Sequence, residues 1–167
     1  MFFQAERREE MRSAAGRWRI RRIIAYMPTW RGKVIDVCAE EQTRQLQDML
    51  DEIDEGLDED TVFLCKLHRL NQQSCSWISA PSAIVRPFPQ GVDTYDVLCA
   101  ADVLVSDYSS VIIDFLCTGR RIVLFCYDHD EYVRKRGCYF DPAQLQLPMA
   151  QTVSALNALL QRESALS

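Results

Sequence analysis

Short apolar runs alternate with amphipathic stretches along this chain. Apolar runs predict strands at residues 20–27, 61–67, 83–86, 102–106 and 121–127. Amphipathic spacing predicts helices at residues 39–55, 93–100, 109–117 and 152–160. The clearest is 39–55, where Leu46, Met49, Leu50 and Ile53 fall on one face and Gly56 follows as a stop signal. Asp93 can cap the next helix.

The order of these elements predicts the fold class. Runs such as 121–127 are apolar on both faces, which suits a parallel sheet covered by helices on both sides. Regular alternation of strand and helix predicts an α/β fold, a Rossmann-like doubly wound parallel sheet. No apolar stretch is long enough to span a bilayer.

Composition narrows the class of protein further. The 167 residues are 48% hydrophobic and 10% aromatic, which excludes a disordered or fibrous chain. We expect a basic lead-in at residues 1–19 and a single domain at 20–167. The seven cysteines show no CxxC spacing and their number is odd, so we expect reduced thiols in a cytoplasmic protein.

Charge is distributed unevenly. The net charge is −5, yet the first 33 residues hold nine basic and three acidic side chains. The basic arm, with Phe2, Phe3 and Trp18, suggests contact with an anionic membrane surface. The alternative is a solvated helical lead-in that packs on a neighbouring segment. The acidic remainder argues against nucleic acid as a partner.

Polar segments follow the predicted strands, at residues 28–32, 66–69, 106–110 and 128–137. In a doubly wound sheet all of them lie at the carboxyl edge, where ligands bind. At 106–110, Ser109 and Ser110 open a helix whose free N–H groups attract phosphate. Asp114 lies on the side of Ser110 and could hold ribose hydroxyls. The alternative, that Ser109 only caps the helix and Asp114 is solvated, stays open.

The two histidines differ in their surroundings. His68 follows a buried strand beside Lys66 and Arg69, so it could bind phosphate or move a proton, although a structural role stays open. His129 lies between two aspartates, and we expect it to be solvated. No GxGxxG, P-loop, Ser-His-Asp signature or metal-binding His/Asp cluster is present in the sequence.

Several motifs together carry a family resemblance. They are Tyr26-Met-Pro-Thr-Trp-Arg31, Lys66-Leu-His68, the run from Asp102 to Asp114, the run from Leu124 to Asp128, Tyr132, and the run from Arg136 to Asp141. In this order they resemble the CDP-glycerol glycerophosphotransferase family, the polymerases and primases of teichoic acid. That family has a GT-B fold of two Rossmann-like halves, and this chain resembles the C-terminal half, which binds the donor nucleotide.

The resemblance implies roles for named residues. His68 would be catalytic, and the donor diphosphate would bind at Thr29, Arg31, Lys66, Ser109, Ser110, Arg136 and Gly137. Asp107 and Asp114 would contact ribose or orient the donor. No metal is required by these motifs, while the two aspartates leave room for Mg²⁺.

The resemblance also implies partners: CDP-glycerol as donor and a lipid-linked polyol phosphate acceptor. The acceptor would be held by an N-terminal half that the sequence lacks, so the chain looks like a fragment or a split gene product. We expect a cytoplasmic protein, peripheral on the inner face of the cell membrane.

The chain also departs from the family pattern. Arg69 stands where the family has proline after the histidine, and Arg120-Arg121 where a proline follows the helix. Two alternatives stay open: a non-catalytic nucleotide-binding module, and a GT-B glycosyltransferase domain that uses a UDP-sugar.

Overall fold

A computed structural model of the chain describes residues 21–29, 39–66, 84–88, 91–136 and 142–161. The expected lead-in at residues 1–19 lies outside these ranges. Four of the cysteines fall within them, and all four are free thiols. No described helix is both long enough and apolar enough to cross a membrane.

The described strands form one sheet in which every neighbouring pair is parallel. They are β1 (Arg22–Met27), β2 (Thr61–Cys65), β3 (Val85–Pro87), β4 (Val103–Ser106), β5 (Arg121–Phe125) and β6 (Met149–Ala150). Their order in the sheet is β3-β2-β1-β4-β5-β6. This order is that of a doubly wound Rossmann-like sheet, so the predicted fold class is confirmed.

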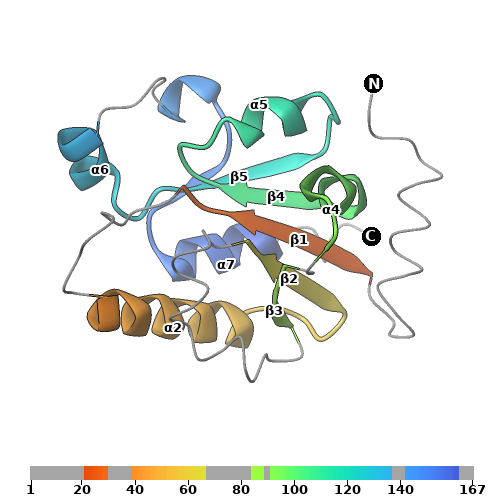
Figure 1. Cartoon of the computed structure of the whole chain (residues 1–167), viewed down its shortest axis with the longest axis horizontal. Coiled ribbons are helices and arrows are strands. Elements are labelled where there is room, and N and C mark those ends of the chain that lie inside the picture. The colour runs from red at the N-terminus through yellow and green to blue at the C-terminus, as the bar shows by residue number, and fades with distance from the viewer. Residues whose placement is uncertain (1–20, 30–38, 67–83, 89–90, 137–141, 162–167) are drawn as a thin grey trace.

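Helices cover both faces of the sheet (Figure 1). α2 (Ala39–Glu55) and α7 (Val153–Gln161) lie on one face, and α4 (Thr94–Ala100) and α5 (Val111–Leu116) lie on the other. α6 (His129–Arg136) lies beyond the carboxyl end of β5, and a 3₁₀ turn, η2 (Pro142–Leu145), precedes β6. The predicted cap of α4 is confirmed, since the Asp93 carboxylate accepts the amide of Tyr95 at 2.8 Å.

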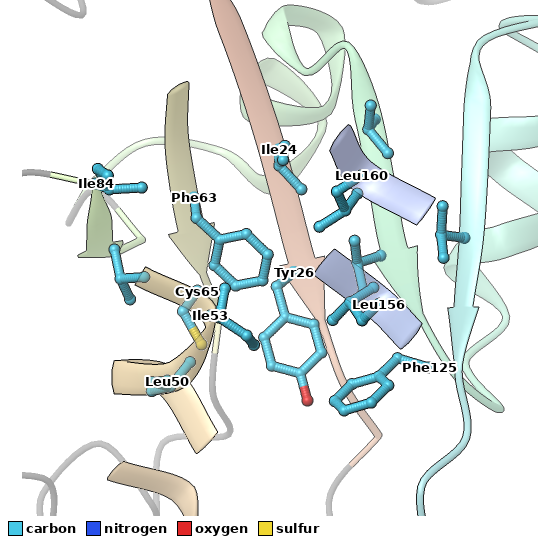
Figure 2. Packing of buried hydrophobic residues seen from close by; sticks show 14 of the residues in the cluster. Ile24, Tyr26, Leu50, Ile53, Phe63, Cys65, Ile84, Phe125, Leu156 and Leu160 are labelled. Carbon is cyan, nitrogen blue, oxygen red and sulfur yellow. The ribbon is translucent and has the colours of Figure 1, made fainter. Parts of the chain in front are cut away.

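Aromatic rings fill the core on the α2 and α7 face (Figure 2). Tyr26 on the central strand β1 lies between Phe63 on β2 and Phe125 on β5, with ring centroids 5.5 and 6.4 Å away. Leu50 and Ile53 of α2 pack onto this layer and are almost fully buried, as the helical spacing predicts. Each such side chain contributes about 1.5–3 kcal/mol through its burial.

The opposite face has its own core. Ala25, Leu104 and Leu124 point from β1, β4 and β5 toward the helices of that face. Ile112 and Phe115 of α5 are fully buried against them. The central strands are therefore buried on both sides, which explains why their sequences are apolar throughout rather than alternating.

Hydrogen bonds from side chains tie α7 and α2 into the sheet. Arg22 at the start of β1 donates to the carbonyl of Leu160 at 2.5 Å. Arg121 at the start of β5 donates to the carbonyl of Leu159 at 2.7 Å. Both carbonyls lie in the last turn of α7, where a positive charge is favourable. At the other end of the sheet, Asp54 of α2 accepts the amide of Val85 on β3 at 3.0 Å.

Arg120, which stands where the resembled family has proline, has a structural role. One guanidinium nitrogen donates to the carbonyl of Cys99 at 2.8 Å and to that of Ala101. The guanidinium carbon lies 4.9 Å from the centroid of the Phe115 ring. Arg120 therefore binds the carboxyl end of α4 while stacking on α5, and it joins the two helices of one face.

Candidate nucleotide site at the carboxyl edge

The sheet order creates a switch point between β1 and β4. These strands are neighbours in the sheet, but the next described helix after β1, α2, lies on one face and α5, which follows β4, lies on the other. The chain therefore diverges at their carboxyl ends, which is where ligands bind in such sheets. In Figure 1 the strands run from right to left, so this edge faces the side on which α6 lies.

Asp107 holds the two diverging segments together. Its carboxylate accepts the amide of Thr29 at 2.9 and 3.1 Å and the hydroxyl of Thr29 at 2.6 Å. It also accepts the amide of Tyr108 at 2.6 Å, and the residue is only 1% exposed. A carboxylate so buried and so occupied orients the loops of the site. This arrangement argues against direct contact of Asp107 with ribose or with Mg²⁺.

A second hydrogen bond reinforces this junction. The hydroxyl of Ser106, which is fully buried, donates to the carbonyl of Met27 at 2.7 Å. The ends of β1 and β4 are thus joined by a side chain at the last pair of the ladder, Met27 and Ser106, and by the Thr29–Asp107 bonds beyond it. The start of segment 106–110 is therefore fixed to the end of β1.

Ser109 and Ser110 lie at the start of α5, as the sequence predicts. The Ser109 hydroxyl accepts the amide of Val111 at 3.4 Å, so the capping interpretation is correct for Ser109. Ser110 is exposed and makes no capping hydrogen bond with its side chain. Among the described residues, the amides of Ser109 and Ser110 have no hydrogen-bond partner. Two backbone donors and one hydroxyl are therefore available to an anion.

Asp114 is engaged with the neighbouring helix. The hydroxyl of Tyr95 on α4 donates to the Asp114 carboxylate at 3.1 Å, and both side chains are exposed. This hydrogen bond, together with the negative charge of Asp114, raises the pKa of the Tyr95 phenol above 10.0. Asp114 is thus neither buried nor simply solvated.

Lys66 lies at the carboxyl end of β2, beside the start of α4. Its ammonium group donates to the hydroxyl of Thr94, the first residue of that helix. The same nitrogen lies 5.5 Å from the centroid of the Phe88 ring. Lys66 is therefore held over the segment after β3.

The segment after β5 differs from its predicted form. Residues 129–136, expected to be loop, form α6. His129, expected to be solvated, is half-buried, and its ring stacks on that of Tyr108 with centroids 6.2 Å apart. Its Nδ1 is buried without a hydrogen-bond partner among the described residues. The prediction was wrong because it rested on the neighbouring charges of Asp128 and Asp130. The contact is made instead by Tyr108, 21 positions earlier in the sequence.

Other predicted site residues fall outside the described part of the chain. They are Arg31, His68, Gly137 and the side chain of Arg136, which is the last residue of α6. The structure therefore brings together Thr29, Asp107, Ser109 and Ser110, with Lys66 one strand away at the same edge. Among the residues that it describes, no group of three His, Cys, Asp or Glu side chains could hold a metal ion.

Comparison with known proteins agrees with the resemblance seen in the motifs. The family model for CDP-Glycerol:Poly(glycerophosphate) glycerophosphotransferase matches residues 2–165. The chain is 31% identical over 140 residues to a teichoic acid glycerol-phosphate transferase of Staphylococcus aureus, covering 81% of this chain and 34% of the relative. It is 32% identical over 117 residues to a teichoic acid glycerol-phosphate primase of Bacillus subtilis, covering 70% and 29%.

Solved structures give the same result for the fold. The wall teichoic acid polymerase TagF, in a variant soaked with CDPG, superposes with a TM-score of 0.73 at 26% identity. The match covers 93% of this chain and 36% of that structure. The chain thus spans about a third of the length of these relatives.

Proposed function

This chain belongs to the CDP-glycerol:poly(glycerophosphate) glycerophosphotransferase family, and we propose that it binds CDP-glycerol as the donor half of a glycerophosphotransferase of teichoic acid synthesis. The observation that carries this proposal is the pair of unpartnered amides at Ser109 and Ser110, at the switch point of the sheet. Backbone N–H groups at that place are the usual partners of a nucleotide diphosphate.

The geometry of the edge supports a preformed anion site. The bonds from Thr29 to Asp107 fix the loop after β1 against the loop after β4. Because the Asp107 carboxylate is buried and accepts hydrogen bonds from Thr29 and Tyr108, its charge is already matched by donors, and the amides of Ser109 and Ser110 can receive phosphate oxygens. A site built before the ligand arrives costs less ordering entropy on binding.

The reaction we propose is an in-line displacement at the β-phosphorus of CDP-glycerol. A terminal hydroxyl of the acceptor forms a new P–O bond, the bond from that phosphorus to the bridging oxygen breaks, and CMP leaves with the electron pair. The family resemblance implies that His68, Arg31 and Arg136 neutralise the charge of the departing CMP, and that a base in the acceptor-binding half takes the hydroxyl proton. The protein contributes mainly by positioning the reactants and neutralising charge.

The acceptor belongs to the same proposal. A lipid-linked polyol phosphate chain would be held by an acceptor-binding half joined to this domain, since the match covers only 34% and 29% of the length of the two relatives. The protein would then work at the inner face of the cell membrane. Co-sedimentation with vesicles tests this part: we expect binding that needs anionic lipid and weakens at high salt, and salt-independent binding would contradict it.

Ligand-induced thermal stabilisation tests the donor site. We expect CDP and CDP-glycerol at millimolar concentration to raise the melting temperature, and UDP or GDP to raise it less. Titrations with Mg²⁺ and with EDTA show whether binding needs a metal. The absence of any shift with a cytidine nucleotide would refute the proposal.

A pair of variants at Ser110 isolates the contribution of the amide. Ser110 has a φ of −61°, which proline accepts without strain at a helix start. Ser110→Pro removes the N–H group, whereas Ser110→Ala removes only the hydroxyl. We expect the proline variant to lose about tenfold in CDP affinity and the alanine variant much less. Equal affinities would show that this amide does not bind the diphosphate.

A further inference from the structure

Tyr108 connects the phosphate-binding segment to α6 through three contacts. Its ring stacks on that of Tyr132, with centroids 3.9 Å apart and planes inclined by 12°. Its other ring neighbour is His129, one turn earlier on α6. Its hydroxyl donates to the carboxylate of Asp128, just before the helix, at 3.5 Å. The side chain of Tyr108 is therefore held by α6 and is only 9% exposed.

The backbone of Tyr108 is held from the other side. Its amide donates to the Asp107 carboxylate, which also accepts both donors of Thr29. Tyr108 thus lies between two anchors, the loop after β1 on its backbone and α6 on its ring. Ser109 and Ser110 follow it directly in the chain, so the placement of Tyr108 determines where their amides point.

α6 is a mostly polar helix. Its sequence is polar except for Tyr132 and Val133, and Val133 is 42% exposed. Tyr132 is the residue of α6 that packs against the core of the α4 and α5 face. The ring stack is therefore the main apolar attachment of this helix among the described residues. Position 136 lies one turn beyond Tyr132 on the same face of α6.

We propose that Tyr132 is a positioning residue for the donor: by stacking on Tyr108 it docks α6 on segment 106–110 and fixes the Ser109 and Ser110 amides for the diphosphate. This inference rests on the proposed function, because it assigns a role in binding the same ligand. It adds that α6, a helix without an apolar face, belongs to the donor site through its ring contacts with Tyr108, of which the Tyr132 stack is the closer. A residue that only packed would affect stability and leave the affinity of the folded protein for CDP unchanged.

Substitutions at Tyr132 separate these roles. Tyr132→Phe keeps the ring, whereas Tyr132→Leu keeps apolar bulk without the stack. Val133→Ala, an exposed position on the same helix, is the matched control. Two properties are measured well below the melting temperature: amide hydrogen exchange of residues 129–136 in the free protein, and CDP affinity by calorimetry.

We expect Tyr132→Leu to speed exchange across α6 and to weaken CDP binding about three- to tenfold. Tyr132→Phe and Val133→Ala should match the wild type in CDP affinity. If the leucine variant does not fold, Tyr132→Met, which fills more of the space of the ring, takes its place.

Two results would overturn the inference while leaving the proposed function intact. One is an unchanged exchange rate across α6 in the leucine variant. The other is faster exchange with an unchanged CDP affinity, which would show that the Tyr108–Tyr132 stack only stabilises α6 and does not position the donor site. A wild-type protein that does not bind CDP would instead refute the proposed function, and with it the donor role of Tyr132, while the exchange data would still decide whether the stack docks α6.

Discussion

Asn157 on α7 occupies the space that a side chain at Gly56 would need. A Cβ built on Gly56 would lie 2.0 Å from Nδ2 of Asn157 and 2.4 Å from its Cγ. The same Nδ2 donates to the carbonyl of Glu52 at 3.0 Å, so the side chain cannot turn away without losing this bond. The close approach of α7 to the end of α2 therefore depends on glycine at position 56.

Gly56→Ala should lower the free energy of unfolding by about 1–2 kcal/mol, because Asn157 must move and its hydrogen bond is lost. Urea denaturation measures the change. In an Asn157→Ala background the two closest atoms, Nδ2 and Cγ, are gone and only the Cβ at 3.1 Å remains, so the alanine at position 56 should cost much less. The same cost in both backgrounds would contradict the contact.

Thr29→Val should destabilise the protein by about 1–2 kcal/mol, since the buried Asp107 carboxylate loses a charge-assisted hydrogen bond. It should also weaken CDP binding, because the loop after β1 is released from the site. Thr152→Val is the matched control: Thr152 accepts the amide of Ala155 at the start of α7, away from the carboxyl edge. That variant should lose about 1 kcal/mol and keep its CDP affinity. Weakened CDP binding in both variants would mean that the effect is not local.

Arg22→Met and Arg121→Met should each cost about 1 kcal/mol, because each leaves a carbonyl in the last turn of α7 without its charged donor. The methionine keeps most of the apolar stem. Arg21→Met serves as control, since that side chain is 77% exposed and pairs with Asp60 at 3.6 Å. We expect less than about 0.5 kcal/mol for this surface pair. A loss at Arg21 equal to the other two would argue against capping.

Tyr95 should titrate above its usual pKa of 10.0 in the folded protein. The neutral phenol is the form that donates to Asp114, so the folded state holds this proton more tightly than the unfolded state does. The hydrogen bond therefore stabilises the fold in full below pH 10, and its contribution is lost as the pH rises through the raised pKa. A difference titration by ultraviolet absorbance between wild type and Tyr95→Phe isolates this phenol. In Asp114→Asn its pKa should return toward 10.0, and a pKa unaffected by that change would contradict the assignment.

Periodicity predicted the central part of the fold because the core is built from long-range apolar contacts with regular spacing. Leu50 and Ile53 show it best, since the face they define is the one that packs under Tyr26. Periodicity failed where an element has no such face. α6 was missed because its apolar residues are only Tyr132 and Val133, and β6 because it has only two residues.

The sequence predicted at which edge of the sheet the site lies, but not which side chains contact one another there. The strand order places Ser109 and Ser110 beside the loop after β1, as the fold class implies. That Asp107 would be occupied by Thr29, 78 residues earlier, could not be read from the sequence. The same holds for His129, whose ring contact with Tyr108 depends on where α6 docks.

The bond between Asp54 and Val85 has a consequence for the outer edge of the sheet. Ile84 and Phe88 bond inward to β2, so the alternating residues Val85 and Pro87 face outward from β3. Of these two outward positions, Val85 has its N–H group bound by Asp54, and Pro87 has none. An incoming strand from another chain would find no free backbone donor along β3. This edge is thereby protected against pairing between molecules and the aggregation that follows from it.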